Sequence, residues 1–206
     1  MTAKIIVETP GKVNLSPRAS KQEGNDMKKI VILTGSPRPK GNSSAMAEAF
    51  AARAEQNGHT VGRFNCAAMS IHGCRACETC YQTGKPCSFD DDFNSMAPAI
   101  LEADAIVFAT PVYWYSFTAQ LKAAIDKMYC FVVGGKPFSG KECGLIACCE
   151  ENDLSALDGV RLPYERMAAL NGWTSLGEVL VPGVLNVGDV EHTDGLERAR
   201  LLADRF

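Results

Sequence analysis

The feature that most constrains the fold is the alternation of short apolar, β-branched runs with longer segments of helical periodicity. Runs that predict strands occupy residues 28–36, 60–66, 104–114, 141–150 and 174–183. Segments that predict helices occupy residues 43–58, 92–103, 118–129, 154–172 and 193–206. A run with a continuous β-branched, apolar centre, such as KKIVILTGS, indicates a strand buried on both faces. Strands separated by helices predict an α/β domain built on a parallel sheet with right-handed crossovers.

We therefore expect a doubly wound, five-stranded parallel sheet with strand order 2-1-3-4-5. In this order a ligand binds at the carboxyl edge of the sheet, where the first and third strands diverge. The loops that reach this edge follow Gly35, Thr110 and Ala147. The sequence thus predicts a binding site formed by these three loops.

The first 26 residues differ from the rest, because they are polar, contain Gly and Pro, and have no sustained apolar core. We expect residues 1–26 to be a flexible N-terminal extension, with a natural start at Met27. The alternative is a short extra strand, KIIVE, that pairs with a sheet edge. Residues 27–206 are expected to form one domain, with a cysteine-rich insertion at 67–90.

Charge and hydropathy limit the classes of partner that the chain can be expected to bind. The chain has 21 Lys and Arg against 24 Asp and Glu, a net charge of −3, with no block of like charge. We therefore expect no nucleic-acid partner and no membrane partner, and the apolar runs are too short to span a bilayer. Without an export signal, the nine cysteines favour a reducing, cytoplasmic location, where clustered cysteines indicate metal or redox chemistry.

The loop TGSPRPKGNSS, residues 34–44, joins the first strand to the first helix. Unpaired N–H groups and the positive end of the helix dipole favour a phosphate at a helix start. Hydroxyl, amide and guanidinium donors are added by Ser36, Arg38, Asn42, Ser43 and Ser44. The spacing fits neither G-x-x-x-x-G-K-[ST] nor G-x-G-x-x-G, which favours a single monophosphate. The alternative is a simple helix cap with solvated cations.

Three consecutive aromatic residues, Tyr113, Trp114 and Tyr115, follow Pro111 at the end of the third predicted strand. They cannot all face one core, so some are expected to be exposed at this edge. Such residues can hold a planar ring system. Alternatively, they pack against neighbouring helices or a second subunit.

Together, GSPRPKGNSS and TPVYWYSFTAQLKAAIDKM resemble the NADPH-dependent FMN reductase-like flavoproteins, which have a flavodoxin-like fold. The resemblance covers about residues 28–180 and implies non-covalent FMN. By position, the phosphate would contact Ser36, Arg38, Asn42, Ser43 and Ser44. The isoalloxazine ring would contact Pro111, Val112, Tyr113 and Trp114, with Cys149 and Glu150 near its other edge. The resemblance also implies a homodimer or homotetramer, and no catalytic side chain beyond the flavin chemistry.

The insertion contains Cys74, Cys77, Cys80 and Cys87 with the spacing C-x2-C-x2-C-x6-C. Three cysteines two residues apart resemble the ferredoxin run that binds a [4Fe–4S] cluster, and the insertion is similar to that of iron–sulfur flavoproteins. Free or redox-active thiols are the alternative, and a zinc site fits less well. The other cysteines include Cys66, Cys130 and Cys143, which are read as small buried hydrophobes. Asp90, Asp91 and Asp92 are read as a helix start.

Two functions follow. The first is an FMN-dependent NAD(P)H oxidoreductase that passes hydride or electrons through flavin to a quinone or another small acceptor. The alternative is an iron–sulfur flavoprotein that carries electrons between protein partners through FMN and a cluster.

Overall fold

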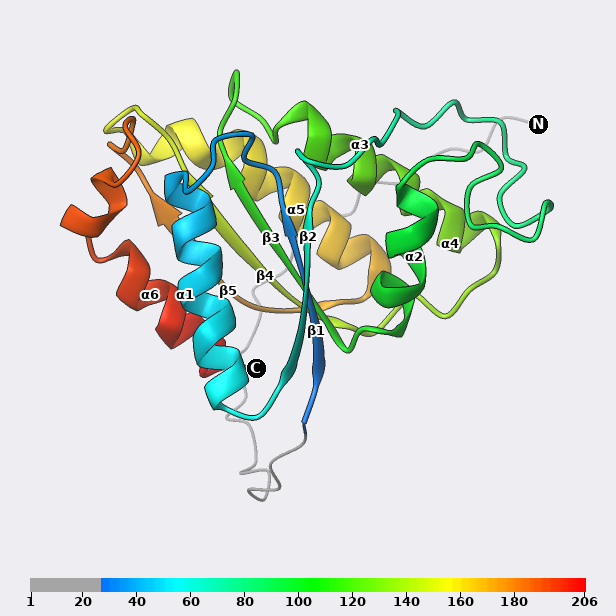
Figure 1. The fold of residues 1–206 in the computed structure, drawn as a ribbon, viewed down its shortest axis with the longest axis horizontal. Helices are drawn as coiled ribbons and strands as arrows, with labels where there is room; N and C mark the ends of the chain where they lie inside the picture. The colour runs from blue at the N-terminus through cyan, green and yellow to red at the C-terminus, as the bar shows by residue number, and fades with distance from the viewer. Residues whose placement is uncertain (1–26) are drawn as a thin grey trace, which may run out of the picture.

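The computed structural model describes residues 27–206, and the expected N-terminal extension lies outside them. A sheet of five strands forms the centre of the described part of the chain (Figure 1). The strands are β1 (Lys29–Thr34), β2 (Thr60–Asn65), β3 (Ala105–Pro111), β4 (Glu142–Cys148) and β5 (Thr174–Val181). Their order is β2-β1-β3-β4-β5, and every neighbouring pair is parallel. The predicted fold class and strand order are confirmed.

Helices cover both faces of the sheet. The α-helices are α1 (Asn42–Gln56), α2 (Phe93–Glu102), α3 (Ala119–Lys127), α4 (Tyr129–Val133), α5 (Asp158–Asn171) and α6 (Gly195–Ala203). Two short 3-10 helices are η1 (Leu154–Leu157) and η2 (Asp189–His192). Figure 1 shows α1 and α6 on one face, and α2 to α5 on the other. Among residues 27–206, no helix has both the length and the apolar character needed to cross a membrane.

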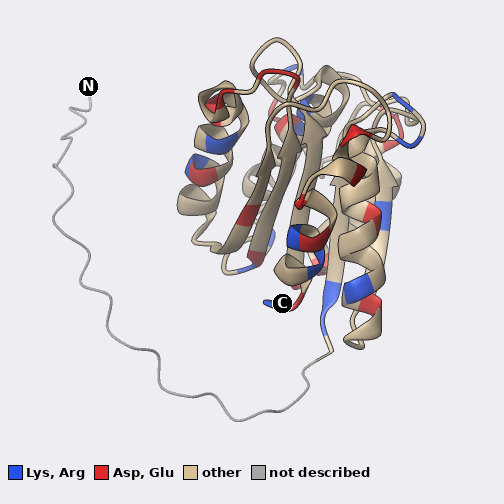
Figure 2. Cartoon of the chain, turned by 90° about the vertical axis from the view of Figure 1, so that its left-hand side faces the viewer, with Lys and Arg blue, Asp and Glu red and all other residues tan. Residues whose placement is uncertain are grey.

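The alternation of side chains along the strands supplies a core to each face. In β1, Ile30 and Ile32 pack into the core beneath α1 and α6, whereas Val31 and Leu33 pack into the core beneath the other helices. This is the physical reason for the four consecutive apolar positions at the centre of β1. Figure 2 shows the strands mostly in tan, with charged residues concentrated on helices and loops.

The start of α3 lies against the end of β1. The backbone N–H of Gly35 donates to the carbonyl of Ala109 at 2.9 Å, which joins the ends of β1 and β3. A Cβ at Gly35 would meet Thr118 Oγ1 at 2.3 Å and Leu121 Cβ at 2.8 Å. Only glycine permits this approach, which places the loop before α3 beside the loop before α1.

Some boundaries differ from those expected. The strand expected to reach residue 114 ends at Pro111, and the helix expected over 118–129 divides at Met128 into α3 and α4. The helix expected from residue 154 begins as η1 and becomes α-helical at Asp158.

Candidate functional site

A cavity of about 650 Å³ opens at the carboxyl edge of the sheet. Residues from all three predicted loops line it, together with residues from a fourth loop that follows β5. This volume lies within the roughly 300–1,000 Å³ that is usual for small-molecule sites. We call it the edge cavity.

The N-terminus of α1 forms one end of the edge cavity. No side chain caps this helix, and its first backbone hydrogen bond runs from Ala45 N–H to the carbonyl of Gly41. The N–H groups of the preceding helical residues therefore have no acceptor within the helix. Ser36, Asn42 and Ser43 are 5%, 8% and 1% exposed and line the cavity. A buried, uncapped helix start of this kind favours an anion.

Gly41 keeps this end open. A Cβ at this position would meet Ser36 Oγ at 2.7 Å and the carbonyl of Arg38 at 3.2 Å. The loop is therefore folded tightly around the helix start, and a side chain at Gly41 would displace Ser36.

Arg38 and Asn42, both expected at a phosphate, also bind the loop after β5. Arg38 Nη1 donates to the carbonyl of Leu185 at 2.7 Å. The Asn42 amide donates to the carbonyl of Asn186 at 2.9 Å, and its oxygen accepts from Gly188 N–H and Val190 N–H at 3.2 and 3.3 Å. These contacts hold the loop as a wall of the edge cavity.

Ser44, also expected at the phosphate, does not line the edge cavity. It lines a neighbouring cavity of about 600 Å³, to which Ser36 and Arg38 also contribute. The structure thus brings four of the five expected phosphate residues to the edge cavity and leaves Ser44 outside it.

The aromatic residues form a tight turn over the cavity. Tyr113 and Ser116 exchange backbone hydrogen bonds of 3.0 and 3.1 Å, and the two central residues, Trp114 and Tyr115, have φ values of 50° and 61°. Bulky residues seldom adopt positive φ, and such strain gathers at functional sites. Trp114 is 97% exposed and Tyr115 60%, as expected for aromatics that share no common core.

The end of β4 forms the opposite wall. Cys148, Cys149 and Glu150 line it, with Glu151. Burial raises the pKa of Cys148 to about 12 and also raises the pKa of Cys149, so both are neutral thiols. Hydrogen bonding to Glu151 raises the pKa of Tyr115, which links this wall to the aromatic turn.

Sequence reasoning missed several lining residues. They are Gly41, Tyr115, Cys148, Glu151, Val184, Leu185 and Val187. The signal for Tyr115 was present in the run of aromatics, but the loop after β5 carries no motif. Its place in the wall follows from its contacts with Arg38 and Asn42, which lie more than 140 positions away.

The four insertion cysteines line a second cavity of about 180 Å³, which we call the thiol cavity. A single water needs only roughly 10–15 Å³ by this measure. Cys74 and Cys77 are exposed, whereas Cys80 and Cys87 are half-buried. Within residues 27–206, no three His, Cys, Asp or Glu side chains are grouped closely enough to hold a single metal ion.

The cysteine run is folded into a tight arc. Ala76, Glu78 and Tyr81 have φ values of 51°, 56° and 63°, which are unfavourable for residues with a Cβ. A hydrogen bond from Thr79 lowers the pKa of Cys77, at an Sγ–Oγ1 distance of 3.1 Å. Strained backbone of this kind is typical of ligand clamps.

Cys87 is held beside the arc from two sides. Its N–H donates to Asn94 Oδ1 at 2.7 Å, and Asn94 Nδ2 donates to its carbonyl at 3.0 Å. The neighbouring Ser88 contacts Thr79 at 2.9 Å between hydroxyls. These contacts hold Cys87 at the thiol cavity with the other three insertion cysteines.

Cys66, Cys130 and Cys143 are buried, as expected for small hydrophobes. Cys130 also lines the thiol cavity, although no motif connects it with the insertion. Burial raises its pKa to about 12, so it is a neutral thiol.

Two groups of relatives match this chain. An iron–sulfur flavoprotein of Archaeoglobus fulgidus is 37% identical over 100 residues, which is 48% of this chain and 45% of that protein. The chain spans about half the length of the iron–sulfur flavoproteins it matches. An FMN-dependent NADH:quinone oxidoreductase of Bordetella bronchiseptica is 26% identical over 86% of this chain and 94% of that protein.

A solved structure shares the fold. It is the NAD(P)H:quinone oxidoreductase from Methanothermobacter marburgensis, with a TM-score of 0.66 and 19% identity, and the match covers 86% of this chain and 94% of that one. The sequence family described as NADPH-dependent FMN reductase matches residues 28–172, which contain β1 to β4 and three of the four loops that line the edge cavity. This chain therefore belongs to the NADPH-dependent FMN reductase family.

Proposed function

We propose that the protein is an FMN-dependent NAD(P)H oxidoreductase that passes hydride or electrons from a nicotinamide to a quinone or another small acceptor. The observation that carries this proposal is the buried, uncapped start of α1, which opens into the edge cavity. Membership of the family and the name of the Bordetella bronchiseptica relative support it.

The residues present fit FMN. The phosphate would lie at the N–H groups of Asn42 and Ser43 with the Ser36 hydroxyl, while Arg38 adds charge. The ring would lie between the backbone of Pro111 and Val112, with the aromatic turn, and the wall that ends in Cys149 and Glu150. Bound FMN supplies the hydride and electron chemistry.

The chain's own residues orient the ring and limit the access of water. Val112 N–H donates to the carbonyl of Cys148 at 2.7 Å, which fixes the distance between the two walls. Val184, Leu185 and Val187 add an apolar wall. Burial keeps Cys148 and Cys149 as neutral thiols, which are not poised as nucleophiles.

An anaerobic flavin spectrum tests this function. FMN-loaded protein should show flavin absorbance that bleaches when NADPH or NADH is added without any partner protein. Flavin that is bound but stays oxidised with both nicotinamides would exclude the oxidoreductase and leave the electron carrier.

An iron–sulfur flavoprotein that carries electrons between proteins is the second candidate function, and the thiol cavity favours it. Cys74, Cys77, Cys80 and Cys87 supply the four thiolates that a [4Fe–4S] cluster uses. A cubane is larger than one ion, so its ligands stand farther apart than those of a single metal. In this form the acceptor would be a redox protein. About four irons per chain after anaerobic reconstitution would support the cluster, and iron-free protein would exclude it.

We also propose a homodimer or homotetramer in which a second copy covers the aromatic turn. Trp114, Leu185 and Val187 are 97%, 49% and 55% exposed beside the edge cavity. Light scattering tests this assembly, which a Trp114→Ser variant should weaken. A monomer at micromolar concentration would contradict it.

All nine cysteines are free thiols, which supports a reducing, cytoplasmic location.

A further inference from the structure

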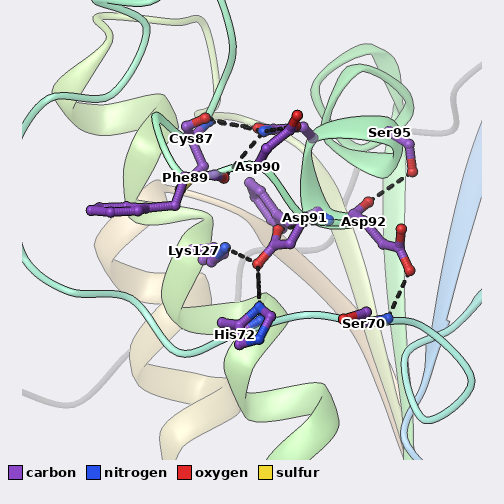
Figure 3. A network of polar contacts seen from close by, with 11 residues as sticks. Ser70, His72, Cys87, Phe89, Asp90, Asp91, Asp92, Ser95 and Lys127 are labelled. Atoms are coloured by element: carbon purple, nitrogen blue, oxygen red, sulfur yellow. Dashed lines mark hydrogen bonds and ion pairs between the residues drawn. The ribbon is translucent and has the colours of Figure 1, made fainter.

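A buried ion pair lies at the thiol cavity. Lys127 Nζ, at the last residue of α3, contacts the carboxylate of Asp91, and both side chains are only 3% exposed. Both residues line the cavity together with the cysteines. Figure 3 shows Lys127 and His72 converging on the Asp91 carboxylate. Removing two charges from water is costly, and a buried pair by itself is weak evidence of a role in stability.

Asp91 is held by several donors. Its Oδ2 accepts from the backbone N–H of His72 at 2.9 Å, and its Oδ1 accepts from the N–H of Phe93 at 3.1 Å. The His72 imidazole Nδ1 lies 3.5 Å from the carboxylate. These contacts fix the carboxylate, which in turn fixes the Lys127 ammonium.

Lys127 is less fully satisfied. An ammonium has three N–H donors, and within the described residues its hydrogen-bond partner is Asp91 alone. The Phe93 ring lies 5.8 Å from Nζ, within the range of a cation–π contact. A buried cation with spare donors thus lines a cavity whose other groups include five thiols.

Asp90 and Arg75 are the other charged side chains that line this cavity. Asp90 pairs with Lys85 at 2.8 Å, and the exposed Arg75 stacks over the Phe89 ring at 4.3 Å. Lys127 is the buried cation among them. A cluster bound by four thiolates is anionic and gains one more negative charge on reduction. A cation in a low-dielectric interior stabilises the more negative state more strongly.

We propose that Lys127, held by Asp91, is a positioning residue whose ammonium stabilises the anionic iron–sulfur–thiolate centre in the thiol cavity, and its reduced state most of all. This inference rests on the proposed cluster. A pair that merely ties the insertion to α3 would make a different prediction, because removal of either partner would then have the same consequence.

The test uses full-length protein reconstituted anaerobically with iron and sulfide. The variants are Lys127→Met, Lys127→Arg and Asp91→Asn, with Lys122→Met as a matched control. Lys122 lies on the same helix but is 46% exposed and pairs with Asp126 away from the cavity. The readouts are iron per chain, the midpoint potential of the cluster, and thermal unfolding of the iron-free protein.

Lys127→Met should disfavour reduction at least tenfold, which lowers a one-electron potential by about 59 mV. Asp91→Asn should raise the potential, because a negative charge is lost. Lys127→Arg and Lys122→Met should match wild type. If Lys127→Met retains no iron while Lys127→Arg does, the requirement for the cation is also supported.

The inference is overturned if Lys127→Met leaves the potential unchanged, or if Lys127→Met and Asp91→Asn shift it in the same direction in step with a common loss of thermal stability. Iron uptake by wild type separates the two failures. If wild type takes up no iron, the proposed cluster fails and this inference fails with it. If wild type takes up iron but Lys127→Met and Asp91→Asn do not shift the midpoint potential in opposite directions, only the role of Lys127 is refuted.

Discussion

Three consecutive aspartates show how the role of a residue depends on its surroundings. The sequence predicts that Asp90, Asp91 and Asp92 all belong to a helix start, but their environments in the structure differ. Asp90 pairs with the exposed Lys85, Asp92 accepts from the N–H of Ser70 at 2.7 Å, and Asp91 is buried against Lys127. The sequence could not separate them, because Ser70 and Lys127 lie 22 and 36 positions away.

The loss of folding stability at low pH should depend on Asp91. Burial alone would raise the pKa of Asp91, but the hydrogen bonds from Lys127 and two backbone N–H groups outweigh it and hold the pKa below its ordinary value. A lowered folded-state pKa stabilises the fold above the unfolded value of about 3.9, and this stability is lost as the pH falls through the folded value. Unfolding temperatures measured between pH 3 and 7 should therefore fall below about pH 4 in wild type.

Asp91→Asn should make the unfolding temperature less dependent on pH in the acid range. At pH 7 it should lower the free energy of unfolding by about 3–5 kcal/mol, because Lys127 is left buried without its partner. Asp126→Asn, at an exposed pair, is the control and should change little. Parallel curves for wild type and Asp91→Asn would show that this carboxyl does not set the acid sensitivity.

Two serines at the start of α1 and in the loop before it give a second test at this scale. Ser36 lines both the edge cavity and the neighbouring cavity, whereas Ser44, in α1, lines the neighbouring cavity but not the edge cavity. Ser36→Ala should weaken FMN binding by about 1.5–3 kcal/mol if its hydroxyl bonds to the charged phosphate. Ser44→Ala should leave it unchanged. Fluorescence titration measures both affinities, and equal losses in the two variants would place the phosphate at the neighbouring cavity that Ser36 and Ser44 share.

At the scale of elements, α5 sets the position of the aromatic turn. Gly159, in its first turn, lies so close that a Cβ would meet the carbonyl oxygen of Tyr115 at 1.6 Å. Gly159→Ala must therefore displace either the helix or the turn. We expect a loss of about 1–3 kcal/mol in the free energy of unfolding, together with weaker FMN binding. Urea unfolding and flavin titration provide the two measurements.

Gly62→Ala, in β2, is the control, because a Cβ there would meet its nearest neighbour at an ordinary 3.6 Å. If Gly159→Ala kept full stability and full FMN affinity, neither property would depend on the close approach of α5 to the aromatic turn.

At the scale of the whole molecule, the sequence predicted the sheet well and the cavities only in part. Strands buried on both faces can be recognised because their central positions are consecutively apolar, as in β1 and β3. Five strands that alternate with helices also fit the observed order 2-1-3-4-5. The loop after β5 was missed because Val184, Leu185 and Val187 reach the edge cavity through contacts with Arg38 and Asn42, which no local pattern encodes. The same limit hid Cys130 and Lys127 at the thiol cavity.

The same scale relates the two cavities. The aromatic turn of the edge cavity precedes α3, and Lys127 of the thiol cavity ends it. A helix of 9 residues spans about 13 Å at roughly 1.5 Å per residue. The two candidate sites are therefore joined by one short, rigid element.

The most direct test of the account compares FMN with riboflavin on wild-type protein by fluorescence titration. The two ligands share the ring and differ by the phosphate, which we place at the uncapped start of α1. The account predicts that FMN binds at least tenfold more tightly, a difference of about 1.4 kcal/mol or more. Equal affinities, or no binding of either ligand, would contradict it.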